Sequence, residues 1–403
     1  MSDLSYMEKL LDGVEVEWRE LGSALVRTKG TNITARRMKT LHKEYAPLKI
    51  FAGGRTVAFV DFKDIPEKDI NRKPSIIVKS RGVIGFEYYA KPFSHKNEMW
   101  SYHSTNKDIN IEYVYYYLKT KESYFQGLAS RMQMPQISTP DTDKLPIPIP
   151  PIRIQNEIVR ILDTFTELTA ELTAELTAEL TARQQQYAYY RKQLLTFNDG
   201  EVEWKTLKEV ALELGRGKSR HRPRNDPKLY GGDVPLIQTG DVRNASHVIN
   251  EYTQTYSKFG LEQSKLWPKG TLCITIAANI AETTILGFDS CFPDSIIGFV
   301  ADPEKTTTSY VEYLLTSFKS ELQAQSTGSA QSNINLATFE RLPFPFPPLA
   351  EQQRIVAILD KFDTLTTSLT EGLPREIELR QQQYEYYRDL LLSFPKPEVV
   401  AHD

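Results

Sequence analysis

The sequence has little or none of what marks a secreted, membrane or metal-binding protein. Only two of its 403 residues are cysteines, Cys273 and Cys291, too few for a disulfide framework or a zinc site. The six histidines show no metal-ligand spacing. No apolar run is long enough to span a membrane, and no secretory signal is visible at the start. We therefore expect a soluble, cytoplasmic protein that binds no metal.

Catalytic motifs are also missing. The nearest match to a phosphate-binding loop is Gly217-Lys218-Ser219, but the glycine that this motif needs five positions earlier is Leu212. There is no Asn-Pro-Pro-aromatic or Asp-Pro-Pro-aromatic run, which an amino-methyltransferase would need. We predict that the chain has no catalytic residues and binds no cofactor of its own.

The most regular stretch that is present runs from Glu167 to Ala182 and contains three copies of Thr-Ala-Glu-Leu. It holds no glycine, proline or aromatic residue, and Ala, Leu and Glu favour helix. Each copy adds about 6 Å of helix and turns the leucine stripe by about 40°. Two interpretations remain open, a ruler whose length follows the number of copies and a low-complexity helix without a metric role. The stripe consists of Leu168, Leu172, Leu176 and Leu180.

The chain is an internal duplication. Leu145 to Phe197 aligns without a gap with Leu342 to Phe394, at a constant offset of 197 residues. Both copies space their apolar residues by three or four, as on an amphipathic helix. Because the flanking segments repeat as well, the chain reads as a circle cut open. Two such helices bury their apolar stripes best against each other, and we expect them to run antiparallel.

Each copy begins with a ladder of alternating prolines. Such a ladder cannot be helical, so we expect extended chain there. It could be a peptide-recognition ligand or a stiff strut into the helix, and its recurrence in both copies favours the strut. In the second helix Gly372 and Pro374 stand where the first has repeats, which predicts a break or kink. The ladders are Pro146, Pro148, Pro150 and Pro151, and Pro343, Pro345, Pro347 and Pro348.

The two remaining parts are predicted to be globular domains of the α+β class. Both alternate short β-type runs with turn signals, such as Ser75–Val78 and Ile296–Val300, and then contain a helical stretch. Their sequences do not look alike. The predicted division is an N-terminal repeated segment (1–18), a first domain (19–144), a central region with the repeat helix (145–204), a second domain (205–341) and a C-terminal region with the second long helix (342–403).

Positive charge is concentrated in the first domain. Residues 19–144 carry 22 Lys+Arg and 13 Asp+Glu, a net +9, whereas the whole chain has a net charge of −3. A basic domain of this kind usually binds a polyanion. Two clusters are candidate phosphate contacts, the alternative being solvated surface. They are Arg36, Arg37, Lys39 and Lys43 in the first domain, and Arg216, Lys218, Arg220, Arg222 and Arg224 in the second.

Near the end of each domain lies a polar, glutamine-rich loop. Arg, Gln and Asn side chains pair bidentately with the base edges of DNA, although they also occur in many other loops. The candidates for base readout are Arg131, Gln133, Gln136, Gln331, Asn333 and Asn335, together with Gln238 and Thr239 in a turn of the second domain.

In this arrangement the chain resembles the specificity subunit of type I restriction–modification enzymes, in particular the type IC-like branch with Thr-Ala-Glu-Leu spacer repeats. The resemblance covers the architecture of the whole chain. It is most specific in Val14–Trp18, Glu157–Phe197 and Gln352–Phe394, which include two Arg-Gln-Gln-Gln-Tyr-x-Tyr-Tyr-Arg blocks. Pro235–Val242 also resembles a segment common in target-recognition domains, where the first domain has Pro47–Gly53 instead.

The resemblance implies two target-recognition domains separated by two long antiparallel helices. Each domain would read one half of an asymmetric, bipartite DNA target, the helices would set the gap, and the subunit would catalyse nothing. Two modification subunits would supply S-adenosylmethionine and methylate adenine, and two restriction subunits would add translocation and cleavage with ATP and Mg. Candidates for subunit contact, with packing between the helices as the alternative, are Tyr187, Tyr190, Tyr384 and Tyr387.

Two other functions stay open. The first is a coiled-coil scaffold that binds only proteins, against which the basic cluster from Arg216 to Arg224 argues. The second is a self-sufficient methyltransferase or nuclease, against which the missing motifs argue.

Overall fold

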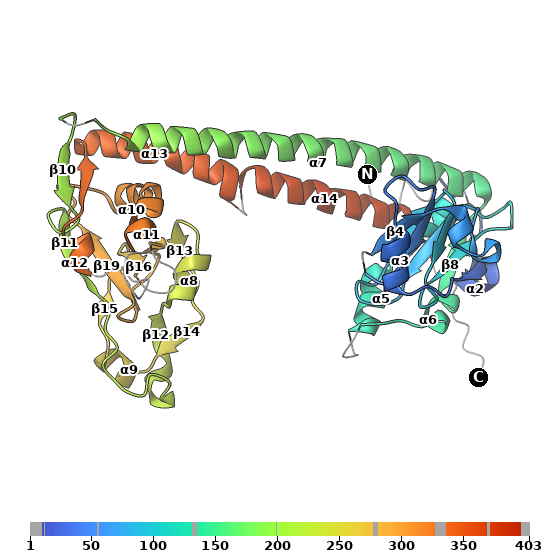
Figure 1. The fold of residues 1–403 in the computed structure, drawn as a ribbon, viewed down its shortest axis with the longest axis horizontal. Coiled ribbons are helices and arrows are strands. Elements are labelled where there is room, and N and C mark those ends of the chain that lie inside the picture. Colours follow the sequence, from blue (N-terminus) through green and yellow to red (C-terminus); the bar gives the residue numbers. More distant parts are fainter. Residues whose placement is uncertain are drawn as a thin grey trace. The chain divides into compact units, whose positions relative to one another are not determined.

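The computed structural model describes residues 10–11, 13–54, 56–130, 135–198, 200–276, 281–326, 336–368 and 371–395. The chain divides into two compact units. Unit 1 comprises Met1–Glu175 and Ile377–Asp403, and unit 2 comprises Leu176–Glu376. Each unit combines sheets with helices (Figure 1), so the predicted α+β class is confirmed. Within the described ranges, no helix is both long and apolar enough to cross a membrane.

Unit 1 contains a four-stranded and a three-stranded sheet besides a two-stranded ribbon. Its elements are β1 (Glu17–Glu20), α2 (Leu21–Ala24), β2 (Val26–Lys29), α3 (Ala35–Leu41), β3 (Leu48–Phe51), β4 (Val57–Val60), β5 (Ser75–Lys79), β6 (Gly85–Tyr89), β7 (Phe93–His95), β8 (Trp100–His103), α4 (Ile111–Lys119), α5 (Glu122–Ala129), α6 (Thr139–Asp143), β9 (Pro146–Ile149) and α7 (Ile152–Leu195), which continues into unit 2. The sheets have the orders β2-β8-β5-β6 and β4-β3-β7.

Unit 2 contains a five-stranded and a four-stranded sheet besides its own ribbon. Its elements are β10 (Glu203–Thr206), β11 (Ala211–Arg216), β12 (Tyr230–Leu236), α8 (Thr239–Asn244), β13 (Val248–Ile249), β14 (Gln254–Tyr256), α9 (Lys258–Glu262), β15 (Leu266–Trp267), β16 (Leu272–Thr275), β17 (Thr283–Leu286), β18 (Ser290–Cys291), β19 (Ile296–Ala301), α10 (Thr308–Ser317), α11 (Lys319–Ser326), α12 (Leu336–Phe339), β20 (Pro343–Phe346), α13 (Leu349–Thr367) and α14 (Gly372–Leu391), which continues into unit 1. The sheets have the orders β11-β19-β16-β17-β13 and β14-β12-β18-β15.

The two globular domains share one topology although their sequences do not look alike. The order β2-β8-β5-β6 matches β11-β19-β16-β17, and β4-β3-β7 matches β14-β12-β18. A close backbone approach also recurs. A Cβ on Gly30, after β2, would lie 2.4 Å from His95 O, and one on Gly217, after β11, would lie 2.2 Å from Phe292 O. Since His95 and Phe292 are 197 positions apart, the duplication extends into the domains.

Matched hydrogen bonds tie each domain to the repeated frame. Tyr113 Oη donates to Pro148 O (3.0 Å), and Tyr310 Oη, 197 positions later, donates to Pro345 O (2.9 Å). Polar groups buried here need such partners, which explains why the same residue types recur. The other matched bonds run from Tyr116 to Asp163 and from Tyr313 to Asp360, both 2.6 Å, and from the buried amides of Gln155 and Gln352 to backbone carbonyls.

Each core is completed by the end of a long helix. In unit 1 the core includes Leu391, Leu392 and Phe394, which come from the far end of the chain. The matching residues Leu195 and Phe197 pack in the core of unit 2. Because segments from both ends of the sequence share one core, the expected circular organisation is confirmed for unit 1.

The proline ladders form strands. β9 pairs antiparallel with β1, and β20 pairs antiparallel with β10. Successive residues of a strand point their N–H groups to opposite sides, so proline at every second position leaves the other N–H groups free to pair. The extended conformation predicted for both ladders is confirmed.

The first long helix is continuous and the second is interrupted. α7 spans 44 residues, whereas α13 ends at Thr367 and α14 begins at Gly372. Gly372 has a φ of +81°, and a Cβ there would lie 2.4 Å from Thr364 O. Pro374 lies in the first turn of α14, where proline is tolerated. The predicted break is confirmed, and Gly372 rather than Pro374 makes it.

Candidate nucleic-acid interface

Asp294, in the turn between β18 and β19, neutralises part of the basic cluster in unit 2. Arg216 donates through Nε to Asp294 O (2.6 Å), and Arg224 donates to both carboxylate oxygens of Asp294 (2.9 and 3.1 Å). The sequence alone makes all five cations of this cluster candidate phosphate contacts. The fold instead brings a carboxylate from 70 positions away to Arg224, so these two arginines have partners inside the protein.

The other three cations of the cluster are exposed. Arg222 donates to two backbone carbonyls of its own loop (2.6 and 2.8 Å). The side chains of Lys218 and Arg220 form no hydrogen bond or ion pair with any residue that the structure describes. Their loop is nevertheless fixed, because Arg220 N donates to Gln263 O (3.1 Å). Lys218 and Arg220 are therefore the residues of this cluster best placed to contact phosphate groups.

An exposed aromatic ring lies beside the basic loop. Phe259, 38% exposed, meets the ring of His221 edge-on with 5.2 Å between centroids. His221 Nε2 lies 2.8 Å from the Asp226 carboxylate. The backbone N–H of Lys228 and then the His221 ring hold the pKa of Asp226 below its usual range. Positive charge next to an aromatic ring is typical of nucleic-acid-binding surfaces.

The basic cluster of unit 1 lies on α3 and the turn after it. Thr34 caps this helix, since its Oγ1 accepts from Arg37 N (3.2 Å), and the opposite face buries Met38. Lys43 forms an ion pair with Asp61. By contrast, no side-chain hydrogen bond or ion pair to another described residue is formed by Arg36, Arg37 or Lys39, all of which are exposed.

The residues predicted to read bases fall into two groups. Gln136 is exposed and forms an isolated bridge with Arg81. Gln238 precedes α8 and its backbone N–H donates to Asp241 Oδ2 (2.8 Å), and Thr239 is the first residue of that helix. The remaining candidates lie outside the described residues, namely Arg131, Gln133, Gln331, Asn333 and Asn335.

The four predicted tyrosines pack between the paired helices of their own units. Burial raises the pKa of Tyr187 to about 12, while Tyr190 and Tyr387 are 41% and 40% exposed. Contact with other subunits stays a prediction for them. The ring contacts are Tyr187 and Tyr190 to Phe362 (5.8 and 5.7 Å) and Tyr387 to Phe165 (5.9 Å), and the Tyr384 hydroxyl lies 3.1 Å from Thr166 Oγ1.

The leucine stripe of the repeats is only partly covered. Leu168 is 56% exposed, whereas Leu172, Leu176 and Leu180 are half-buried. In unit 1, Leu168 and Leu172 line a hollow of about 210 Å³ between α7 and α14, together with Phe165 and Tyr384. The repeats thus add length to α7 without being locked into a tightly packed core.

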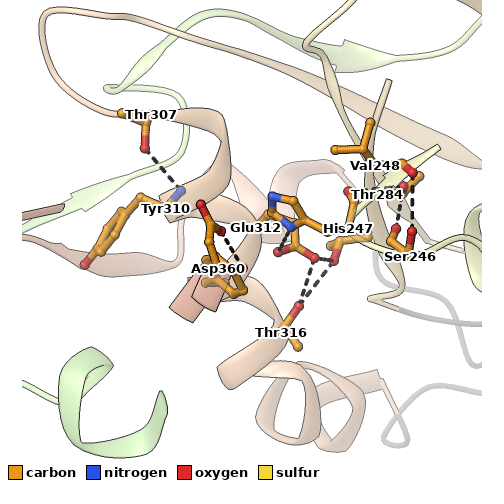
Figure 2. A network of polar contacts seen from close by, with 11 residues as sticks. Ser246, His247, Val248, Thr284, Thr307, Tyr310, Glu312, Thr316 and Asp360 are labelled. Carbon is orange, nitrogen blue, oxygen red and sulfur yellow. Dashed lines mark hydrogen bonds and ion pairs between the residues drawn. The ribbon is translucent and has the colours of Figure 1, made fainter. Parts of the chain in front are cut away.

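A largely buried ion pair lies inside the second domain (Figure 2). His247 Nδ1 lies 2.9 Å from Glu312 of α10, and the His247 ring stacks on Tyr313 with 5.0 Å between centroids. Thr283 donates to the same carboxylate (3.1 Å). Unit 1 has Tyr115 where unit 2 has Glu312, 197 positions apart. The ion pair is therefore a feature of unit 2 that unit 1 replaces by aromatic packing, Tyr115 lying 5.9 Å from Tyr88.

The stability that His247 contributes should depend on pH. Burial alone would lower its pKa, but the hydrogen bond and charge of Glu312, with the charges of Asp360 and Asp363 behind it, raise the pKa above the ordinary 6.5. The contribution is then fully present below pH 6.5 and is lost as the pH rises through the raised value. We expect His247→Gln to destabilise the chain by about 1–3 kcal/mol at pH 6 and by less at pH 9, measured by thermal unfolding. An equal loss at both values would contradict a charged pair.

A family model matches the chain over residues 33–182 and 200–379, and its description is "Type I restriction modification DNA specificity domain". The chain belongs to this family. The EcoR124I/EcoR124II specificity subunit of Escherichia coli is 38% identical over 417 aligned residues, which cover 100% of both chains. A putative type I restriction enzyme specificity subunit of Haemophilus influenzae is 32% identical, over 97% of this chain and 98% of that protein.

Two solved structures show the same fold at low sequence identity. A chain from a study of complex assembly and conformational transition in the type I R-M system has a TM-score of 0.66 at 14% identity, covering 94% of this chain and 98% of the other. The HsdS subunit of Thermoanaerobacter tengcongensis has a TM-score of 0.55 at 14% identity, covering 95% and 98%. The family model and the curated relatives confirm the predicted family, whereas the type IC-like branch stays a prediction.

As a specificity subunit, the chain is not itself an enzyme, in agreement with the prediction from its missing motifs. In the described ranges no group of three or more His, Cys, Asp or Glu side chains could hold a metal ion. Sequence reasoning missed Asp294, Phe259 and Tyr45, which is 91% exposed in the turn after α3. Tyr45 and Phe259 each had a local signal, since Tyr45 follows the charged pair Lys43-Glu44 and Phe259 follows Lys258.

Proposed function

We propose that this specificity subunit directs a type I restriction–modification complex to an asymmetric, bipartite DNA target, each globular domain reading one half. One observation carries the proposal. Two domains of one topology are fastened to a repeated frame by matched hydrogen bonds, yet their exposed basic elements differ. In unit 1 these cations lie on α3, and in unit 2 on the loop after β11. A shared frame with unlike surfaces is what two different half-sites require.

We assign the predicted segments accordingly, with target-recognition domains at 19–144 and 205–341 and repeated regions at 1–18, 145–204 and 342–403. The long helices would set the gap between the half-sites. Duplex DNA, two modification subunits and two restriction subunits are the expected partners. S-adenosylmethionine, ATP and Mg would be bound by those partners, and the assembly would work on DNA in the cytoplasm.

A binding and transfer assay tests this proposal. The purified chain should bind duplex DNA with an affinity that falls steeply with salt, and it should transfer no methyl group when given S-adenosylmethionine. Addition of the modification subunit should produce methylated adenine. If the chain binds no DNA at any salt concentration, the result would support the protein scaffold instead. Methyl transfer by the isolated chain would support a self-sufficient methyltransferase.

A further inference from the structure

Four segments of unit 1 meet at one end of the first domain and are joined by hydrogen bonds. We call this region the turn cluster. It comprises the β3–β4 turn at Gly54, the β5–β6 turn at residues 80–83, the β7–β8 turn at residues 96–99, and the chain after α5 at residues 135–137. The bonds between them are Gly54 N to Arg81 O (3.3 Å), Gly82 N to Pro135 O (3.0 Å), Ile137 N to Ser80 O (3.0 Å) and Ser80 Oγ to Glu98 O.

The outer side of the turn cluster is open backbone. Gly54 and Gly82 have φ values of +68° and +75°, and a Cβ on Gly54 would meet no atom of a described residue within 4 Å. The nearest atom to a Cβ on Gly82 is Gly54 Cα, at 4.0 Å. Glycines with free space above them allow close approach of a ligand. Ser80, in the same turn as Gly82, is buried at 1% exposure, so the backbone beneath these glycines is held in place.

The turn cluster carries one exposed cation and one ion pair. Arg81 is exposed, and its guanidinium forms no hydrogen bond or ion pair with a described residue. Beside it, Lys96 and Glu98 form an ion pair of 2.6 Å in which the side chains are 22% and 19% exposed. Burial would raise the pKa of Glu98, but its bond to Lys96 and the charges of Lys96 and Arg81 hold it below the usual range. Glu98 is thus a charged acceptor at neutral pH.

We propose that Arg81 determines specificity by reading a guanine in the major groove of the half-site bound by the first domain. This rests on the proposed function and names one residue that carries it out. Arginine pairs bidentately with O6 and N7 of guanine. The neighbouring carboxylate favours a base edge over a phosphate, because Glu98 accepts from the amino group of an adjacent cytosine or adenine, whereas a phosphate group offers no donor. Among the described residues no carboxylate pairs with the exposed cations of α3, and the Lys43–Asp61 pair lies in the turn after that helix, which suits phosphate contact by α3.

The test is a methylation map of DNA from cells that express the modification subunit with the wild-type chain, Arg81→Ala or Arg81→Lys. Arg81→Ala should relax one position of one half-site from guanine to other bases, with a loss of about 10- to 100-fold in discrimination there. Arg81→Lys should restore it only in part, since lysine lacks the planar, preorganised fork of arginine. The other half-site should stay unchanged, which shows that the variant folds and assembles. Lys39→Ala, the matched control on α3, should lower methylation without changing the motif.

An unchanged motif with Arg81→Ala, or full restoration by Arg81→Lys, would overturn the assignment. If Arg81→Ala abolishes methylation, competition binding of the assembled complexes decides. Replacing the guanine by 7-deazaguanine should weaken wild-type binding at least tenfold and leave Arg81→Ala binding unaffected, and equal weakening of both would overturn the proposal. Failure of the proposed function itself would look different, because the wild-type map would then show no bipartite motif.

Discussion

Deleting Thr169–Leu172, one copy of the repeat, should shorten the gap between the two halves of the DNA target by one or two base pairs. α7 is continuous over 44 residues and passes from unit 1 into unit 2. Four residues are about 6 Å of helix, against about 3.4 Å of DNA axis per base pair. After the deletion Thr173 and Leu176 follow Leu168 in place of Thr169 and Leu172. Since the residue types are the same, α7 should stay helical, although the part after the deletion turns by about 40°.

The gap is measured by mapping methylated adenines with the wild-type and deleted chains. The matched control replaces the same four residues with four alanines, which keeps the length of the helix and should keep the gap. A shortened chain that still methylates the wild-type target would show that the repeat has no metric role. The same gap change in the alanine variant would attribute it to lost side chains rather than to lost length.

Neutralising Lys218 or Arg220 should weaken DNA binding by the isolated chain and make it less dependent on salt. Each residue is exposed and forms no hydrogen bond or ion pair through its side chain with another described residue. A phosphate contact releases about one counterion, so each glutamine variant should reduce the slope of log affinity against log salt by about 1. The target sequence should not change, because phosphate contacts carry no base information.

The control for this prediction is Lys361→Gln. Lys361 is an exposed lysine on α13 and, like Lys218, has no ion pair with a described residue. It should leave the salt slope unaltered. Arg216→Gln is not a suitable control, because Arg216 holds Asp294 O and its loss would shift the loop. Unaltered slopes for both Lys218→Gln and Arg220→Gln would place the DNA elsewhere on unit 2.

Local patterns were enough to predict the frame. The offset of 197 residues located both long helices, and the proline ladders gave the extended segments before them. Gly372 marked the break in the second helix. These features depend on residues close together in the sequence, namely helix spacing, missing N–H groups and a positive φ. The sequence showed Gln155 and Gln352 as matching residues of the two copies. It did not show that their side chains form hydrogen bonds at the start of each long helix.

The folds of the globular domains were harder to predict, because their cores bring together residues that are far apart in the sequence. The common topology is carried by hydrophobic strands that different sequences satisfy equally well, so similarity was not visible by alignment. The same distance explains which contacts of the site sequence reasoning missed. Asp294 reaches Arg224 across 70 positions, and no local pattern reports such a partner. Arg81 lies in an ordinary turn, and only folding brings it beside Glu98 and Gln136.

The central claim is that one chain reads two different half-sites at a fixed distance. The most direct test is a methylation map of DNA from cells that contain this chain and its modification subunit. The account predicts methylated adenine in two short, unlike motifs separated by a constant gap. Unmodified DNA in the presence of the assembled complex, or methylation in a single undivided motif, would contradict it.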